Sequence, residues 1–276
     1  MVIEIKDDFD LQKIADSGQC FRIKTFDDGA YRFVTGSHIL YIRQCGQGCY
    51  DVNCSEEEWR EIWFPYFDLP QNYSRLRSLV PASDAYMLNA AKTGSGLRIL
   101  RQEPWEMVIT FIISQRKNIP SIKKSVELLS AGFGEPVVTP YEKLYLFPSA
   151  KKLVSASDDA LSECRLGYRT SYIQDAAQKI ASNQINLSAL KQVDDTELFD
   201  ALKQIRGVGD KVANCICLFA YGRTSHVPVD TWIHKVIEHE YHGKEPFTRY
   251  GKYAGIMQQY IFYYAQTHKK ELQPVR

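Results

Sequence analysis

The sequence predicts an α+β protein, with a twisted antiparallel sheet near the N-terminus followed by an all-helical region. Residues 1 to about 54 alternate between apolar and polar side chains and are broken by turn signals, as short paired strands are. From Glu56 onward, apolar residues recur every three or four positions, which is the period of helices with one buried face. A Gly-Val-Gly turn at 207–209 joins two of these helical stretches.

The candidate strands lie in short segments separated by hairpin-type turns. The turns are Asp-Asp-Gly at 27–29, Thr-Gly-Ser at 35–37 and Cys-Gly-Gln-Gly at 45–48. Cys45, Cys49 and Cys54 lie in this region without a CxxC pair, so we interpret them as strand residues and expect no metal site. The candidate strands are MVIEIK, CFRIK, AYRFVTG, HILYIRQ and CYDV.

The helical periodicity begins with EEEWREIWFPYF and continues to the end of the chain. Pro104 is well placed in the first turn of a helix whose apolar stripe includes Val108 and Ile112. We place the domain boundary near residues 95–100, which gives a sheet domain with flanking helices at 1–98 and a helical domain at 99–276. Further helices are expected within 71–92, at 120–131, 149–155, 157–164, 169–182 and 196–204, and in the closing stretch 250–270.

Composition indicates an ordinary globular protein of 276 residues, 45% hydrophobic and 24% charged. The formal net charge of +1 neither favours nor excludes nucleic acid, because a local basic face is enough to bind it. The seven Cys are scattered, and the sequence has no signal-peptide pattern and no apolar run near ~18 residues. We therefore predict a cytoplasmic protein with reduced thiols and no membrane contact. We expect a monomer with no obligate protein partner.

The most informative stretch runs from Leu202 to Asp230. Gly207 and Gly209 can adopt positive φ and allow another backbone to approach closely. Lys211 lies in the first turn of the next helix, where the positive end of the helix dipole opposes its protonation. An amine that is neutral part of the time is a nucleophile, so Lys211 is a candidate catalytic residue.

The same stretch has a simpler interpretation. The amides around Gly207, Val208 and Gly209 could grip one DNA phosphate, with Lys211 as a further phosphate contact. That would make the chain a non-catalytic helix-hairpin-helix DNA-binding protein. Asp230 precedes TWIHKVIEH and could be the N-cap of that helix, although a capping carboxylate can also present its charge to a pocket.

The combination of GVG, Lys211 and the Asp of VPVD nineteen positions later resembles the DNA glycosylases with a helix-hairpin-helix and a Gly/Pro-rich loop. It is most similar to the 8-oxoguanine DNA glycosylase/AP lyase family. Nearly the whole chain takes part in the likeness, in the same order as the family's motifs. The matching segments are SGQCFR at 17–22, Leu97 to Asn118, FPS at 147–149, LGYR at 166–169 and YAG at 253–255.

The resemblance implies a bifunctional enzyme that acts on double-stranded DNA containing 8-oxoguanine, without metal or cofactor. In it, Lys211 attacks the sugar and Asp230 assists. The carbonyl of Gly18 distinguishes the lesion by accepting from its N7 hydrogen, which guanine lacks. The resemblance also implies that Cys215 and Phe262 lie on the two faces of the flipped base, and that Gln258 reads its edge while Phe219 continues the pocket. Tyr168 would be the wedge that fills the space left in the base stack, and Arg169 would contact the opposite cytosine.

Alternatives remain open for these residues. Cys215, Phe219 and Phe262 could simply be core residues, and Tyr168 an ordinary tyrosine. A related glycosylase for another lesion is a further alternative, which Gly18, Gln258 and Phe262 argue against.

The sequence departs from the family pattern where the opposite cytosine is read. Three family asparagines correspond to Arg116, Lys117 and Asn118, and a following arginine corresponds to Ser121. We therefore predict a weakened preference for cytosine, with Arg116 and Lys117 on DNA phosphates. Trp232 replaces a family histidine and Ala265 a late aspartate, so phosphate contact there is expected to be rearranged.

Overall fold

The computed structural model describes residues 1–268, which divide into two compact units. One unit contains residues 1–33, 40–101 and 222 onward, and the other contains residues 34–39 and 102–221. The N-terminal sheet and the last helices of the chain thus belong to the same unit. The α+β fold class expected from the sequence is confirmed.

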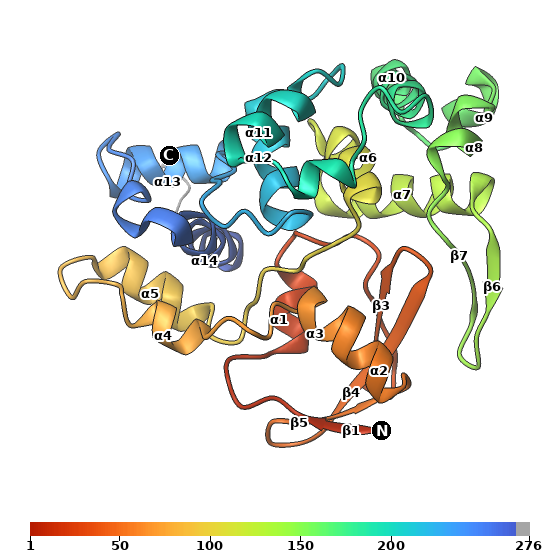
Figure 1. Ribbon diagram of the computed structural model, residues 1–276. Coiled ribbons are helices and arrows are strands. Elements are labelled where there is room, and N and C mark those ends of the chain that lie inside the picture. The colour runs from red at the N-terminus through yellow and green to blue at the C-terminus, as the bar shows by residue number, and fades with distance from the viewer. Residues whose placement is uncertain (269–276) are drawn as a thin grey trace. The chain divides into compact units, whose positions relative to one another are not determined.

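A five-stranded sheet with the order β1-β5-β4-β3-β2 forms the N-terminal part of the first unit (Figure 1). β1 and β4 both pair antiparallel with β5, and a bulge lies between Gln44 and Gly46 of β4. The strands are β1 (Val2–Glu4), β2 (Lys24–Thr25), β3 (Tyr31–Thr35), β4 (His38–Gly46) and β5 (Cys49–Val52).

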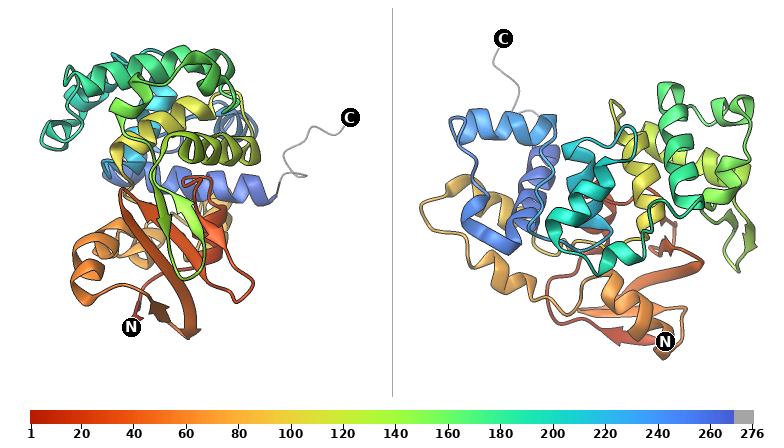
Figure 2. Two further views of the ribbon diagram at one scale, coloured as in Figure 1. Left: turned by 90° about the vertical axis from the view of Figure 1, so that its right-hand side faces the viewer. Right: turned by 45° about the horizontal axis from the view of Figure 1, so that its top comes forward.

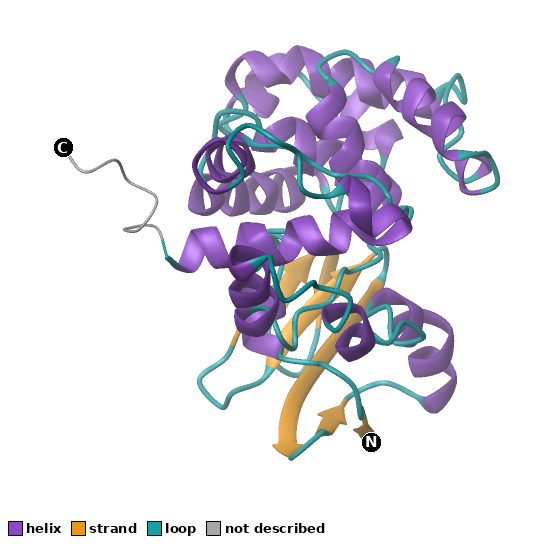
Figure 3. Cartoon of the chain, turned by 90° about the vertical axis from the view of Figure 1, so that its left-hand side faces the viewer, coloured by secondary structure: helices purple, strands orange, loops and turns teal. Residues whose placement is uncertain are grey.

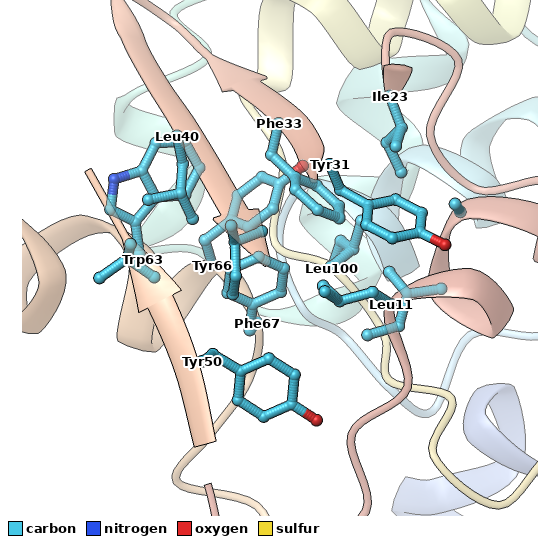
Figure 4. Close-up of a cluster of buried hydrophobic side chains, with 14 of the residues drawn as sticks. Leu11, Ile23, Tyr31, Phe33, Leu40, Tyr50, Trp63, Tyr66, Phe67 and Leu100 are labelled. Carbon is cyan, nitrogen blue, oxygen red and sulfur yellow. The ribbon is translucent and has the colours of Figure 1, made fainter. Parts of the chain in front are cut away.

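Buried aromatic side chains pack one face of this sheet against helical segments (Figure 4). The Phe33 ring of β3 meets the ring of Phe67 edge-on, with centroids 5.0 Å apart. Trp63 and Tyr66, from the same helical segment as Phe67, join this cluster, with their ring centroids 5.2 Å apart. The predicted helix through EEEWREIWFPYF is therefore the layer that covers the sheet.

Helix α1 (Leu11–Asp16) lies between the first two candidate strands, in a region where the sequence predicts strands and no helix. Asp10 caps it by accepting from the Lys13 amide, and Leu11 and Ile14 are buried in the sheet core. The neighbouring CFRIK segment contributes only its last residue to a strand, β2. A six-residue helix is too short for periodicity to distinguish it from a strand.

A second group of helices in this unit packs around α14, which contacts α5 and α13 (Figure 3). α14 is buried on nearly all sides, and residues 269–270 of the predicted closing stretch lie outside the described residues. The helical segments are α2 (Glu56–Glu58), the π-helical η1 (Trp59–Trp63), α3 (Phe64–Tyr66), α4 (Tyr73–Arg77), α5 (Ala85–Thr93), α13 (Thr231–Glu240), the 3₁₀ turn η4 (Thr248–Tyr253) and α14 (Ala254–Thr267).

The second unit is mostly helical, with α12 packed against both α6 and α11, and α10 against α8 (Figure 2). A small hairpin of β6 and β7 was not predicted from the sequence, because three-residue strands carry almost no pattern. The elements are α6 (Pro104–Ser114), α7 (Ile119–Phe133), β6 (Pro136–Val138), β7 (Lys143–Tyr145), α8 (Ala150–Val154), α9 (Asp158–Ser162), η2 (Gly167–Arg169), α10 (Thr170–Ala181), η3 (Ala189–Lys191), α11 (Asp195–Lys203) and α12 (Asp210–Phe219).

Within residues 1–268, no helix combines the length and the apolar character that crossing a membrane requires. In the same range, no group of His, Cys, Asp and Glu side chains is arranged to hold a metal ion.

Candidate active site

The candidate residues are distributed over both units. Asp230 belongs to the unit that contains the sheet, and Lys211 belongs to the helical unit. With Asp230 are Gly18, Trp232, Gln258 and Phe262. With Lys211 are Arg116, Lys117, Asn118, Tyr168, Arg169, Gly207, Val208, Gly209, Cys215 and Phe219.

The Gly-Val-Gly turn leads directly into α12. Gly207 has φ +84°, and a Cβ atom at this position would overlap the ring of Tyr172. Gly209 is the N-cap of α12 with φ −94°, so only Gly207 uses the left-handed freedom of glycine. No side chain caps α12, and a Cβ atom added at Gly209 would have no neighbour within 4 Å. The start of α12 thus presents backbone amides on an open side, which suits a phosphate.

Helix α10 holds this turn in place. The Asp175 Oδ2 atom accepts from the Arg206 amide at 2.8 Å and from the Lys179 ammonium at 2.9 Å. The same ammonium donates to the Gln204 carbonyl at 2.6 Å. From the other side, the Gln115 side-chain amide donates to the Gly207 carbonyl at 3.0 Å.

Lys211 lies half-buried in the first turn of α12, beside an aromatic surface. Its Nζ atom is 5.5 Å from the centroid of the Phe111 ring, and that ring stacks on Phe219 with 17° between the planes. Cys215, one turn further along, is buried. The amine of Lys211 thus lies over the face of an aromatic ring at the start of α12.

Asp230 is the N-cap of α13. Its Oδ1 atom accepts from the amides of Trp232 at 3.0 Å and Ile233 at 2.9 Å. The N-cap interpretation of Asp230 is therefore confirmed, and amide donors of this kind favour the ionised carboxylate. Trp232 is half-buried, with the Lys235 ammonium 5.3 Å from its ring centroid.

The turn that contains Gly18 is bonded to α14. The Gln259 side-chain amide donates to the carbonyl of Ser17 at 2.7 Å, and both residues are buried. Gly18 follows with φ +73°. Next to Gln259, the Gln258 side chain is 2% exposed, and its Oε1 atom has no hydrogen-bond partner in the described part of the chain. Phe262, one turn later, is half-buried.

Tyr168 and Arg169 form a stacked pair just before α10. Tyr168 is 50% exposed, and the Arg169 guanidinium carbon lies 4.4 Å from its ring centroid. Arg169 itself is only 6% exposed and donates to the carbonyls of Leu166, at 3.1 Å, and Gln115.

The three residues at the positions of the family asparagines, of which Asn118 keeps the asparagine, have different surroundings. Arg116 is exposed and has φ +51°. The ammonium of Lys117 donates to the Ser125 hydroxyl and the Arg165 carbonyl, each at 2.6 Å. Asn118 is the N-cap of α7 and accepts from the Ser121 amide at 2.9 Å.

Sequence reasoning missed Gln115, Tyr172, Asp175 and Lys179, which hold the turn. The spacing of the last three along α10 is a regular helical stripe, and this was the available signal. The atoms that these side chains contact in the turn are more than 20 positions away in the sequence, so the stripe could not reveal what it contacts.

Two family models together match residues 1–249 of the chain. One is described as 8-oxoguanine DNA glycosylase, N-terminal domain, and matches residues 1–108. The other is described as HhH-GPD superfamily base excision DNA repair protein, and matches residues 109–249.

A curated relative is the N-glycosylase/DNA lyase of Saccharomyces cerevisiae, 32% identical over 190 residues. The match covers 62% of this chain and only half of the yeast protein.

Two solved structures are similar over nearly the full length. The first is MBOgg1 in complex with a low affinity DNA ligand, with a TM-score of 0.91 and 35% identity, covering 97% of this chain and 96% of the other. The second is the 8-oxoguanine glycosylase/lyase of Clostridium acetobutylicum, in complex with double-stranded DNA that carries cytosine opposite 8-oxoguanine. Its TM-score is 0.88 at 32% identity, covering 98% of each chain.

Proposed function

This chain belongs to the 8-oxoguanine DNA glycosylase family of the HhH-GPD superfamily, and from that premise we propose that it excises 8-oxoguanine from double-stranded DNA and then cleaves the strand. It is an N-glycosylase/DNA lyase of base excision repair. The observation that carries this proposal is Lys211, half-buried at the start of α12 directly after the Gly-Val-Gly turn and beside the Phe111 ring.

The turn and the lysine have separate tasks in the reaction. The amides at the start of α12 bind a backbone phosphate, and the neutral amine of Lys211 attacks C1′ of the extruded nucleotide. The bond from C1′ to the base breaks, and its electron pair leaves with the base. Asp230 stabilises the positive charge that develops on the sugar.

Strand cleavage follows from the covalent intermediate. After the sugar ring opens, Lys211 and C1′ form a Schiff base. This acidifies the C2′ protons, and loss of one expels the 3′ phosphate by β-elimination. A binding module without chemistry needs the turn but neither Lys211 nor Asp230.

Recognition of the oxidised base depends on the Gly18 turn and α14. The Gly18 carbonyl accepts from the N7 hydrogen of 8-oxoguanine, whereas the lone pair of guanine N7 would repel it. Gln258 reads the edge of the base, with Cys215 and Phe262 on its faces and Phe219 extending the pocket. The bond from Gln259 to Ser17 and the unpartnered Oε1 atom of Gln258 support this assignment.

The preference for cytosine opposite the lesion is weakened. The Asn118 side chain caps α7, and the ammonium of Lys117 bonds to Ser125 and Arg165, which supports the loss of base contacts at both positions. Arg116 contacts phosphate, and Arg169 is the remaining reader of the opposite base. Equal excision rates opposite C and opposite A are the expected result. A strong preference for C would contradict it.

Borohydride trapping on duplexes with different lesions tests the reaction itself. We expect a covalent adduct with 8-oxoguanine DNA, and none with Lys211→Gln, which should still bind DNA. Absence of any adduct would leave a DNA-binding protein without this chemistry. An adduct formed only with another lesion would keep the enzyme and change its substrate.

A further inference from the structure

We propose that Lys117 is a positioning residue that holds the Tyr168 wedge in place, and that it does not contact a DNA phosphate. Together with Arg169 it forms a reciprocal connection between two loops, residues 115–117 and 165–169, which we call the cationic clasp. The proposal rests on the proposed function, because the wedge matters only if a base is extruded.

The clasp consists of two cations that reach in opposite directions. The Lys117 ammonium extends from the first loop to the Arg165 carbonyl at 2.6 Å. The Arg169 guanidinium extends from the second loop back to the Gln115 carbonyl. Each loop therefore donates one charged hydrogen bond and accepts one, and charge-assisted bonds of this kind are the stronger class.

Both loops have a backbone that needs such support. Arg116 and Arg165 are non-glycine residues with φ of +51° and +58°. This conformation is costly for ordinary side chains and persists where surrounding contacts impose it. One bond of the clasp ends at the carbonyl of Gln115, the residue directly before Arg116. The other ends at the carbonyl of Arg165 itself.

The surroundings of Lys117 also argue against a phosphate contact. Its ammonium is bonded to the hydroxyl of Ser125, a fully buried residue. Burial lowers the pKa of Lys117, and the nearby charges of Arg169 and Arg165 lower it further. The Ser125 hydroxyl and the Arg165 carbonyl already bind this ammonium, so a DNA phosphate would have to compete with two protein acceptors.

The clasp reaches the wedge through Arg169. The guanidinium that bonds to Gln115 also stacks on the Tyr168 ring, and the Tyr172 ring meets that ring edge-to-face with centroids 5.8 Å apart. The Gln115 side chain bonds in turn to the Gly207 carbonyl. Loss of the Lys117 ammonium should therefore loosen residues 165–169 and leave Tyr168 less well placed.

Amide hydrogen exchange in the free, full-length protein tests the clasp directly. We expect Lys117→Met to accelerate exchange at residues 165–169, whereas Lys124→Met, at an exposed lysine of the following helix α7, should not. Ser125→Ala removes the buried acceptor, which cannot touch DNA, and should act in the same direction. Unchanged exchange in Lys117→Met would overturn the proposal, and this readout does not depend on any enzymatic activity.

Binding and excision then separate positioning from phosphate contact. With Lys117→Met we expect single-turnover excision of 8-oxoguanine to fall about tenfold, because the wedge is displaced. The salt dependence of DNA binding should stay that of the parent. If the slope of the logarithm of the DNA-binding constant against the logarithm of salt concentration is smaller by about one while the excision rate is unchanged, Lys117 contacts a phosphate and the proposal is refuted. Lys117→Arg retains the donors and should recover part of the excision rate, which also guards against a folding defect.

Discussion

The side-chain amide of Gln259 bonds to the backbone carbonyl of Ser17 at 2.7 Å, although 242 positions separate the two residues in the sequence. This bond fixes the turn that contains Gly18 against the helix that carries Gln258 and Phe262. A carbonyl proposed to read N7 is useful only if it is held still relative to the group that reads the rest of the base.

Gln259→Leu should therefore impair lesion recognition more than strand cleavage. We expect excision of 8-oxoguanine to fall while cleavage at a preformed abasic site is largely retained, because the second reaction needs no base contact. Stability should drop by about 1–3 kcal/mol, since the buried Ser17 carbonyl loses a donor. Gln266→Leu on the same helix is the control, and an equal loss of both activities in Gln259→Leu would contradict this role.

The two glycines of the turn should respond differently to alanine. Gly207→Ala introduces a Cβ atom into the Tyr172 ring at φ +84°, so we expect it to cost about 1–3 kcal/mol in thermal unfolding. Gly209→Ala meets no atom and needs no unusual φ, so its unfolding should resemble that of the parent. Its DNA affinity should fall if a phosphate approaches there. Normal DNA binding by Gly209→Ala would place the phosphate elsewhere.

Asp230 caps α13 and is proposed to act in catalysis, and two substitutions can separate these roles. Asp230→Asn keeps an oxygen that accepts from Trp232 and Ile233, so stability should be retained while excision falls about a hundredfold through loss of the charge. Asp230→Ala should also lose about 0.5–2 kcal/mol of stability with the cap. If Asp230→Asn excises at the parental rate, the carboxylate has no electrostatic role.

Acid should remove a stabilising contribution of Asp7. Burial alone would raise the pKa of Asp7, but bonds from Ser74 and Tyr73 lower it on balance below 3.8. A lowered pKa contributes stability that is fully present above the unfolded value and is lost as pH falls through the folded one. The melting temperatures of the parent and Asp7→Asn should therefore differ near neutral pH and converge below about pH 3.8. A constant difference down to pH 2–3 would contradict this.

Local patterns predicted most of the fold. They also placed Lys211 and Asp230 at the starts of helices α12 and α13, because the signals for both helix starts lie within one 29-residue stretch, whereas the catalytic roles of the two residues stay predictions. The short helix α1 and the β6–β7 hairpin escaped because a few residues do not establish a period. The inward bonds of Lys117 escaped as well, because charge in a sequence does not tell whether a side chain meets solvent or a carbonyl 48 positions away.

The unit that contains the sheet is assembled from both ends of the chain, around the intervening residues 102–221. During synthesis from the N-terminus, that intervening segment leaves the ribosome before α13 and α14 exist. Closing a loop of roughly 120 residues carries an entropic cost that only the completed C-terminal helices can offset. The residues around Lys211 can thus fold early, whereas the Gly18 turn and α14, which are proposed to distinguish damaged from intact guanine, come together last. This order would keep a nascent chain from acting on DNA before it can recognise the damaged base.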